Sequence, residues 1–161
     1  MPMRRWSVVP LFGTLMLLLG VAMAAEDQAK ETPFPKLPNG AGEISRDAPK
    51  KFTQTKSGLK YRILRAGKGV KPNATDTIEV NYHGWLPSGE VFDSSYERGE
   101  SISFPLNRVI KGWTEGMQIV AEGGMIELEI PPELAYGKRG VPGAIPPDAR
   151  LHFLVELIRV E

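Results

Sequence analysis

The chain has 161 residues, of which 42% are hydrophobic and 24% charged, a composition typical of one globular domain of ordinary size. Arg4 and Arg5 are two of its 20 basic residues and no acid precedes Glu26, so residues 25–161 carry 18 basic and 19 acidic side chains. A balance so close to neutral gives no argument for a nucleic-acid partner or for attraction to an anionic membrane. Because the chain has no cysteine, disulfides, thiolate metal ligands and a cysteine nucleophile are excluded.

Residues 1–24 have the pattern of an export signal. The basic pair Arg4-Arg5 precedes an uncharged apolar stretch, and Ala22-Met23-Ala24 places small residues where a signal peptidase cleaves, which predicts cleavage after Ala24. The apolar stretch is just long enough to span a bilayer, so an uncleaved membrane anchor is the alternative. Both interpretations place the rest of the chain outside the cytoplasm, and the periplasm is the favoured location.

Residues 25–51 are predicted to be a flexible linker. They contain four prolines, few apolar side chains and charges of both signs, so they bury too little surface to offset the entropy of ordering them. We expect at most local packing of Phe34 and Leu37. The pattern changes at Phe52, and residues 52–161 form the predicted domain.

The domain is predicted to be mainly β-structure, because apolar and polar side chains alternate in short segments separated by turns rich in glycine and proline. In the clearest segment Ile78, Val80 and Tyr82 face one side of the sheet and His83 faces the other. The predicted strands are residues 59–64, 77–83, 90–94, 102–104, 125–130 and 151–160. On the outward side of the last strand, Leu154 is too apolar to be fully exposed.

One helix is predicted, beginning at Asn107 as a favourable N-cap residue and ending at Gly123-Gly124. An apolar stripe at three- and four-residue spacing runs along it: Val109, Ile110, Trp113, Met117 and Val120. A single short helix among strands is expected to lie in the concave face of a twisted sheet, with Trp113 pointing inward. The predicted fold is α+β, an antiparallel sheet of five to six strands wrapped around one short helix.

Aromatic side chains converge on this helix in the predicted arrangement: Tyr82, Phe92, Phe104, Trp113, Tyr136 and Phe153. A core needs some of them, but so many on one small sheet favour a concave apolar binding site. Asp93 follows Phe92 directly, and because a carboxylate beside an aromatic floor is costly unless hydrogen-bonded, we interpret Asp93 as functional. The alternatives are that Trp113 is only a core residue and that Asp93 is a solvated acid that caps Ser94 or Ser95.

Four segments resemble the FKBP-type peptidyl-prolyl cis-trans isomerases in order and spacing: VNYHGWLPSGEVFDSS, FPLNRVIKGWTEGM, AYGKRGVPGAIPP and LHFLVEL. The resemblance covers about residues 55–161. It implies a half-barrel sheet around a short helix, with a proline ring bound between them above Trp113. Two positions, Ile102 and Val141, depart from well-known members, and this affects substrate preference and inhibitor affinity rather than the reaction class.

The resemblance also implies the roles of individual residues. The residues with expected catalytic roles are Tyr82, Asp93, Ile110, Tyr136 and Phe153. The residues with expected substrate-binding roles are Phe92, Phe104, Val109, Trp113 and Ile145. The backbone N–H of Ile110 and the hydroxyl of Tyr136 are the candidate donors to a substrate carbonyl.

The expected chemistry needs no nucleophile, metal or cofactor. Rotation about a peptide bond has a barrier of about 18–20 kcal/mol, because amide resonance must be broken. A dry aromatic pocket disfavours the polar planar amide more than the twisted one, which is differential stabilisation of the transition state. The two histidines, His83 and His152, are too few and too far apart to predict a metal site.

Two functions are compatible with these residues. The first is an isomerase that accelerates X–Pro isomerisation while exported proteins fold, and the aromatic floor with Asp93 favours it. The second is a chaperone or binding module that holds proline-containing segments with weak turnover.

The resemblance further implies binding of rapamycin- or tacrolimus-type macrolides. We expect no nucleic-acid partner and no membrane association beyond an uncleaved anchor.

Overall fold

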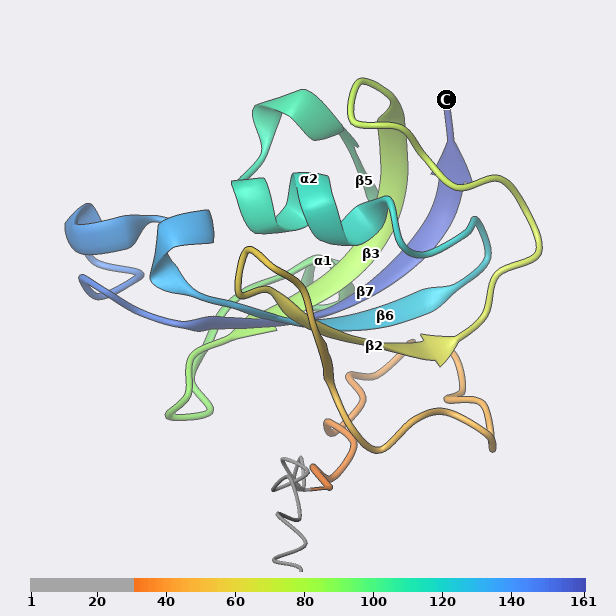
Figure 1. Ribbon diagram of the computed structural model, residues 1–161, viewed down its shortest axis with the longest axis horizontal. Helices are drawn as coiled ribbons and strands as arrows, with labels where there is room; N and C mark the ends of the chain where they lie inside the picture. The colour runs from red at the N-terminus through yellow and green to blue at the C-terminus, as the bar shows by residue number, and fades with distance from the viewer. Residues whose placement is uncertain (1–30) are drawn as a thin grey trace, which may run out of the picture.

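A single antiparallel sheet dominates the computed structural model, which describes residues 31–161 (Figure 1). The predicted export signal lies outside the described residues. The strands are β1 (Thr53–Gln54), β2 (Lys60–Arg65), β3 (Thr77–Trp85), β4 (Val91–Ser94), β5 (Ile102–Pro105), β6 (Met125–Ile130) and β7 (Leu151–Val160). They are ordered β1-β2-β6-β7-β3-β4, and β5 also pairs with β3. Among residues 31–161, no helix is long and apolar enough to cross a bilayer.

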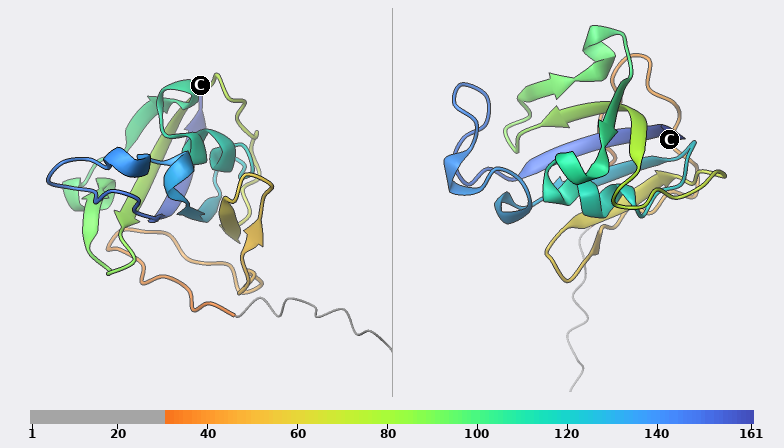
Figure 2. Two further views of the ribbon diagram at one scale, coloured as in Figure 1. Left: turned by 60° about the vertical axis from the view of Figure 1, so that its left-hand side comes forward. Right: turned by 90° about the horizontal axis from the view of Figure 1, so that it is seen from above.

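Helix α2 (Lys111–Met117) lies across the concave face of the curved sheet, which confirms the predicted α+β architecture (Figures 1 and 2). The sheet has seven strands rather than five or six, because the two-residue strand β1 pairs with β2. The alternation predicted in β3 is present, since Ile78, Val80 and Tyr82 are buried on the concave side. The core of the domain therefore lies between this face and α2.

Two glycines allow α2 to approach the sheet closely. A Cβ atom at Gly112 would lie 2.4 Å from Cγ2 of Ile130, and one at Gly116 would lie 2.8 Å from Cδ2 of Leu128. Both neighbours are buried side chains of β6, so neither has free space to move into. The close contact buries Trp113, which is only 4% exposed.

The helix is shorter than predicted, and Asn107 is not its N-cap. Leu106–Arg108 form a separate 3₁₀ turn, and Ile110 is the residue that precedes α2. The hydroxyl of Thr114 donates to the carbonyl oxygen of Leu106 at 2.6 Å. Because a side chain satisfies that carbonyl, the backbone does not need a continuous helix there, and Ile110 stays extended with φ −59° and ψ 148°.

Residues 31–51 pack along the outer face of the sheet, which corrects the expectation of a flexible linker (Figures 1 and 2). The segment contains no helix or strand, but Leu37, Ala41 and Ile44 contact a buried apolar cluster on that face. The cluster consists of Leu64, Met125 and Leu154. The outer face of the sheet thus supplies apolar surface that the segment lacks by itself, and it accounts for the apolar character of Leu154.

Arg62 joins the same segment to the sheet from a fully buried position. Its Nε donates to Oε2 of Glu127 at 2.6 Å, and its guanidinium lies over the rings of Phe34 and Phe52, at 4.9 and 4.6 Å from their centroids. Its remaining nitrogens donate to three carbonyl oxygens of the segment, those of Thr32, Pro33 and Lys50. A buried cation is tolerated only when paired and hydrogen-bonded, so these carbonyls are needed for the folded state.

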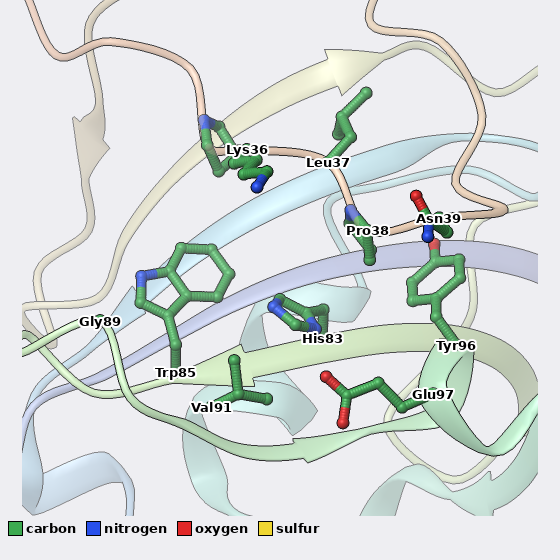
Figure 3. Close-up of a pocket in the computed structure, with 11 residues that line it drawn as sticks. Lys36, Leu37, Pro38, Asn39, His83, Trp85, Gly89, Val91, Tyr96 and Glu97 are labelled. Atoms are coloured by element: carbon green, nitrogen blue, oxygen red, sulfur yellow. The ribbon is translucent and has the colours of Figure 1, made fainter.

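A cavity of about 630 Å³ separates part of this segment from the outer side of β3 and β4 (Figure 3). His83 and Trp85 of β3 line it, together with Tyr96 and with Leu37 of the segment. His83 therefore faces away from Tyr82, as the alternation in β3 predicts. Burial lowers the pKa of His83 below its usual value of 6.5, against the opposite influence of nearby Glu97.

We predict that a chain beginning at Phe52 is less stable than one beginning at Glu31. The shorter chain exposes the apolar cluster around Leu154 and leaves buried Arg62 without its carbonyl acceptors. Leaving a buried polar group unsatisfied typically costs about 1–3 kcal/mol, and more for a charged one. Urea denaturation followed by tryptophan fluorescence should show a free energy of unfolding lower by at least about this amount.

Arg62→Ala in the longer chain serves as the comparison, since it keeps the segment and removes the three hydrogen bonds to it, together with the one to Glu127. Its free energy of unfolding should fall by a large part of the difference between the two chain lengths. Coinciding urea midpoints for the two chain lengths would contradict the structural role assigned to residues 31–51.

Candidate active site

A cavity of about 800 Å³ opens between α2 and the concave face of the sheet. Of the ten predicted site residues, the following line it: Tyr82, Phe92, Asp93, Phe104, Val109, Ile110, Trp113, Tyr136 and Phe153. They come from β3, β4, β5, β7, α2 and the loops beside α2 and after β6, segments far apart in the sequence. Ile102, noted above as a departure from the family pattern, also lines the cavity at its exposed edge.

Ile145 is the predicted site residue that does not line this cavity. It is 7% exposed and belongs to the hydrophobic core, with Val141 packed beside it. The two residues exchange backbone hydrogen bonds of 2.8 Å and so close a tight turn in the long loop after β6. Ile145 therefore anchors that loop to the core cluster, which also contains the cavity residues Trp113 and Phe153.

Edge-to-face aromatic contacts build the floor of the cavity around Trp113. Its ring centroid lies 5.4 Å from that of Tyr82, 5.8 Å from Phe104 and 5.3 Å from Phe153. The three interplanar angles are 87°, 84° and 84°, the arrangement that aromatic quadrupoles favour. Each ring is held by its neighbours, so the floor is preformed and offers an apolar surface.

Gly84 makes room for the side of the cavity formed by Phe92 and Phe153. It lies opposite Phe153 in the pairing of β3 with β7. A Cβ atom at Gly84 would lie 2.7 Å from Cζ of Phe92 and 2.8 Å from Cε1 of Phe153. The missing side chain lets both rings lie over β3, where they meet edge to face at 5.4 Å.

Asp93 is part of a hydrogen-bonded cluster rather than a solvated acid in a turn. Its carboxylate accepts hydrogen bonds from the hydroxyl of Tyr82 and from the guanidinium of Arg98. Arg98 also donates to the hydroxyl oxygen of Tyr82 at 3.0 Å, and its guanidinium lies 5.6 Å from the centroid of that ring. The three side chains form a closed, charge-balanced triangle at the rim of the aromatic floor.

Sequence reasoning missed Arg98 because it did not predict the single-turn helix α1 (Ser95–Arg98). Ser94 is its N-cap and accepts a hydrogen bond from the backbone N–H of Glu97. A serine followed three residues later by glutamate is the sequence pattern of a capping box, and this signal predicts a helical turn that folds Arg98 back toward Asp93. Arg108 and Ala135 also line the cavity and were not predicted.

The cluster keeps one protonation state near neutral pH. Burial raises the pKa of Asp93, but the hydrogen bonds from Tyr82 and Arg98 outweigh it and hold that pKa below its usual 3.8. Burial, reinforced by the hydrogen bond to Asp93, raises the pKa of Tyr82 above its usual 10.0. Asp93 is therefore an anion and Tyr82 a neutral donor across the physiological range.

Ile110 and Tyr136 each have a hydrogen-bond donor that is available to a ligand at the cavity. The backbone N–H of Ile110 donates to no other group in residues 31–161, because the chain turns into α2 only after this residue. The hydroxyl of Tyr136 makes no hydrogen bond to another described residue, and this side chain is 43% exposed at the cavity mouth. An apolar floor with free donors at its edge fits a ligand that has an apolar ring and a carbonyl oxygen.

Comparison with known proteins agrees with this geometry. The family described as FKBP-type peptidyl-prolyl cis-trans isomerase matches residues 68–158. The chain is 55% identical over 115 residues to the FKBP-type peptidyl-prolyl cis-trans isomerase FkpA of Escherichia coli K12, covering 71% of this chain and 42% of FkpA. It is 49% identical over 105 residues to the peptidyl-prolyl cis-trans isomerase Mip of Coxiella burnetii, covering 65% of this chain and 46% of Mip.

Solved structures give the same result. The crystal structure of FkpA from Escherichia coli matches with a TM-score of 0.67 at 53% identity, covering 68% of this chain and 51% of that one. A peptidyl-prolyl cis-trans isomerase from Pseudomonas syringae matches with a TM-score of 0.65 at 37% identity, covering 68% and 80%. The chain spans less than half the length of FkpA and Mip. On the family match and these identities, the chain belongs to the FKBP-type peptidyl-prolyl cis-trans isomerases.

Proposed function

We propose that the chain is a peptidyl-prolyl cis-trans isomerase that accelerates X–Pro isomerisation in exported proteins as they fold. The observation that carries the proposal is the preformed aromatic cavity with the unpaired N–H of Ile110 at its edge. X–Pro bonds isomerise in tens to hundreds of seconds without a catalyst, slowly enough to limit folding. An enzyme for this step needs to bind the proline ring and to favour the twisted amide.

The aromatic floor provides the binding and part of the catalysis. A proline ring against Trp113 removes apolar surface from water and brings the preceding amide into a site of low polarity. The planar amide is more polar than the twisted one, so its transfer from water is the less favourable of the two. Each ~1.4 kcal/mol of that difference raises the rate about tenfold.

The polar groups at the rim orient the substrate. The N–H of Ile110 and the hydroxyl of Tyr136 each offer a hydrogen bond to a substrate carbonyl. Asp93, held by Arg98, keeps the Tyr82 ring in place and sets a negative charge beside the rotating amide. Since this charge is already compensated by Arg98, it acts through its local field and not by accepting a proton.

We further propose that the protein works in the periplasm on unfolded or partly folded exported proteins. The support is the export pattern of residues 1–24 together with the similarity to FkpA. The same cavity is expected to bind rapamycin- or tacrolimus-type macrolides in competition with substrate. The alternative, a chaperone or binding module with weak turnover, would use the same apolar surface but would not accelerate isomerisation.

The first test is a proline-isomerisation assay with short X–Pro peptides, with and without rapamycin as competitor. We expect turnover that rises linearly with enzyme concentration and is inhibited by rapamycin. Binding of the peptides without acceleration of isomerisation would favour the alternative. Turnover that rapamycin leaves unchanged would contradict the proposed macrolide binding but not the isomerase activity.

Phe153→Ala and Asp93→Ala should separate the structural and chemical contributions of the site. Phe153 is a buried core residue that also forms one side of the cavity. Replacing a buried Phe by Ala typically costs about 3–5 kcal/mol, so both the stability and the activity of Phe153→Ala should fall. Asp93→Ala should lower kcat/KM with little change in melting temperature, because Asp93 is half-buried at the rim.

Asp47→Ala, at an exposed acid in the outer segment, is the control for removing one negative charge. Asp47→Ala should change neither kcat/KM nor the melting temperature. A large fall in the melting temperature of Asp93→Ala, with normal activity per folded molecule, would show that Asp93 serves folding and not catalysis. Melting temperatures come from circular dichroism, and activities from the peptide assay.

The pH dependence of kcat/KM on a neutral peptide should be nearly flat between about pH 6 and 9. The pKa of Asp93 lies below 3.8 and that of Tyr82 above 10.0, so neither group changes charge in this range. Burial lowers the pKa of His83, and its side chain faces the opposite cavity, so its titration does not change the charge of the site under α2 (Figure 3). The expected profile therefore lacks the bell shape of an essential acid–base pair.

His83→Ala should leave this profile unchanged. A drop of about tenfold near the usual histidine pKa that disappears in His83→Ala would contradict the mechanism and assign a catalytic proton transfer to His83. The measurement is a pH series at constant ionic strength on the unmodified chain and on this variant.

A further inference from the structure

We propose that the cavity prefers X–Pro segments with an acidic side chain close to the proline, and that Arg108 is the residue that determines this preference. The proposal rests on the isomerase function proposed above and names its substrate class. It comes from the charges at the rim of the cavity, where one cation is left without a counter-charge.

The charged residues that line the cavity are Asp93, Arg98 and Arg108. Asp93 forms an ion pair with Arg98, and its second carboxylate oxygen accepts the hydrogen bond from Tyr82. The carboxylate is thus fully engaged and does not neutralise a second cation. Arg108 is exposed and forms no ion pair or side-chain hydrogen bond within residues 31–161. The lining of the cavity consequently carries one uncompensated positive charge.

The backbone places Arg108 close to the proposed carbonyl-binding group. Arg108 ends the 3₁₀ turn, and Val109 is extended, with φ −112° and ψ 176°. Arg108 and Ile110 lie two residues apart, and both line the cavity. A substrate carbonyl bound to the N–H of Ile110 would therefore lie in the part of the cavity whose lining includes Arg108.

The neighbouring substrate residues lie within reach of that guanidinium. An extended peptide advances about 3.3–3.6 Å per residue, so a side chain one or two positions from the bound carbonyl is close to Arg108. The fixed fork of N–H donors on arginine matches a carboxylate in a bidentate pair. An aspartate or glutamate at these positions gains an ion pair, whereas a lysine meets an unpaired like charge.

The expected preference is modest because Arg108 is exposed to solvent. Ion pairs at exposed sites change an equilibrium or rate constant by about 1.5- to 5-fold, and salt weakens them. The aromatic floor supplies most of the affinity, so neutral peptides remain substrates. The proposal is therefore tested by the ratio of kcat/KM between peptides that differ only in charge, and by how that ratio changes with ionic strength. We do not expect neutral peptides to be rejected.

The experiment compares kcat/KM for peptides that differ only in having Glu, Gln or Lys before proline, and for a second set with that residue one position earlier. The Glu/Gln ratio is measured for the full chain, for Arg108→Gln and for Arg108→Glu, at low and high salt. Arg46→Gln is the charge-matched control, because Arg46 is an exposed arginine of the outer segment and does not line the cavity.

We expect a Glu/Gln ratio of about 1.5 to 5 in at least one peptide set for the unmodified chain and for Arg46→Gln. The ratio should approach one in Arg108→Gln and at high salt, and fall below one in Arg108→Glu. A ratio that Arg108→Gln leaves unchanged, or a ratio of one in both sets for the unmodified chain, would overturn the proposal while all peptides are still turned over. A lack of turnover on every peptide would instead overturn the isomerase function.

Discussion

The pairing of β3 with β7 is the constraint on which both faces of the molecule depend. The register sets Tyr82 opposite Val155 and Gly84 opposite Phe153, so the concave side has aromatic rings where β3 leaves space for them. The same pairing sets His83 opposite Leu154 on the outer side. A shift by one residue would exchange the two faces, so the register that builds the cavity also creates the apolar surface that residues 31–51 cover.

The cavity combines an apolar floor with charges that are almost all compensated. Asp93 is held at the rim by Tyr82 and Arg98, so its negative charge is present without the desolvation cost of an unpaired carboxylate. Because the protonation states of this cluster stay constant near neutrality, the site suits a rotation that transfers no proton. We expect selectivity to come from the edge, where Arg108 has no ion pair within residues 31–161 and the substrate is still partly solvated.

Patterns of alternating side chains predicted the sheet well, because one buried face gives each strand a clear period of two. The features that sequence reasoning missed depend on contacts between distant segments. The late start of the helix, at Lys111, depends on the Thr114 side chain reaching Leu106, and the packing of residues 31–51 depends on Arg62 and the outer cluster. Arg98 was missed because a single helical turn has almost no periodicity. Ile145, expected at the cavity by resemblance, packs in the same core cluster as Trp113 and Phe153.

The structural domain is longer than the part that the family match covers. That match spans residues 68–158, whereas β2 and the segment covering the outer face precede it. Buried Arg62, which precedes the matched region, connects it to the sheet through a hydrogen bond to Glu127 of β6. Strand β6 in turn pairs with β7, which carries Phe153 of the aromatic floor. The contacts described above for residues 31–51 go to Arg62 and to the outer apolar cluster, so we expect the segment to affect function through the stability of the sheet. Changes there should alter how much protein is folded, whereas changes at the rim alter what the folded protein selects.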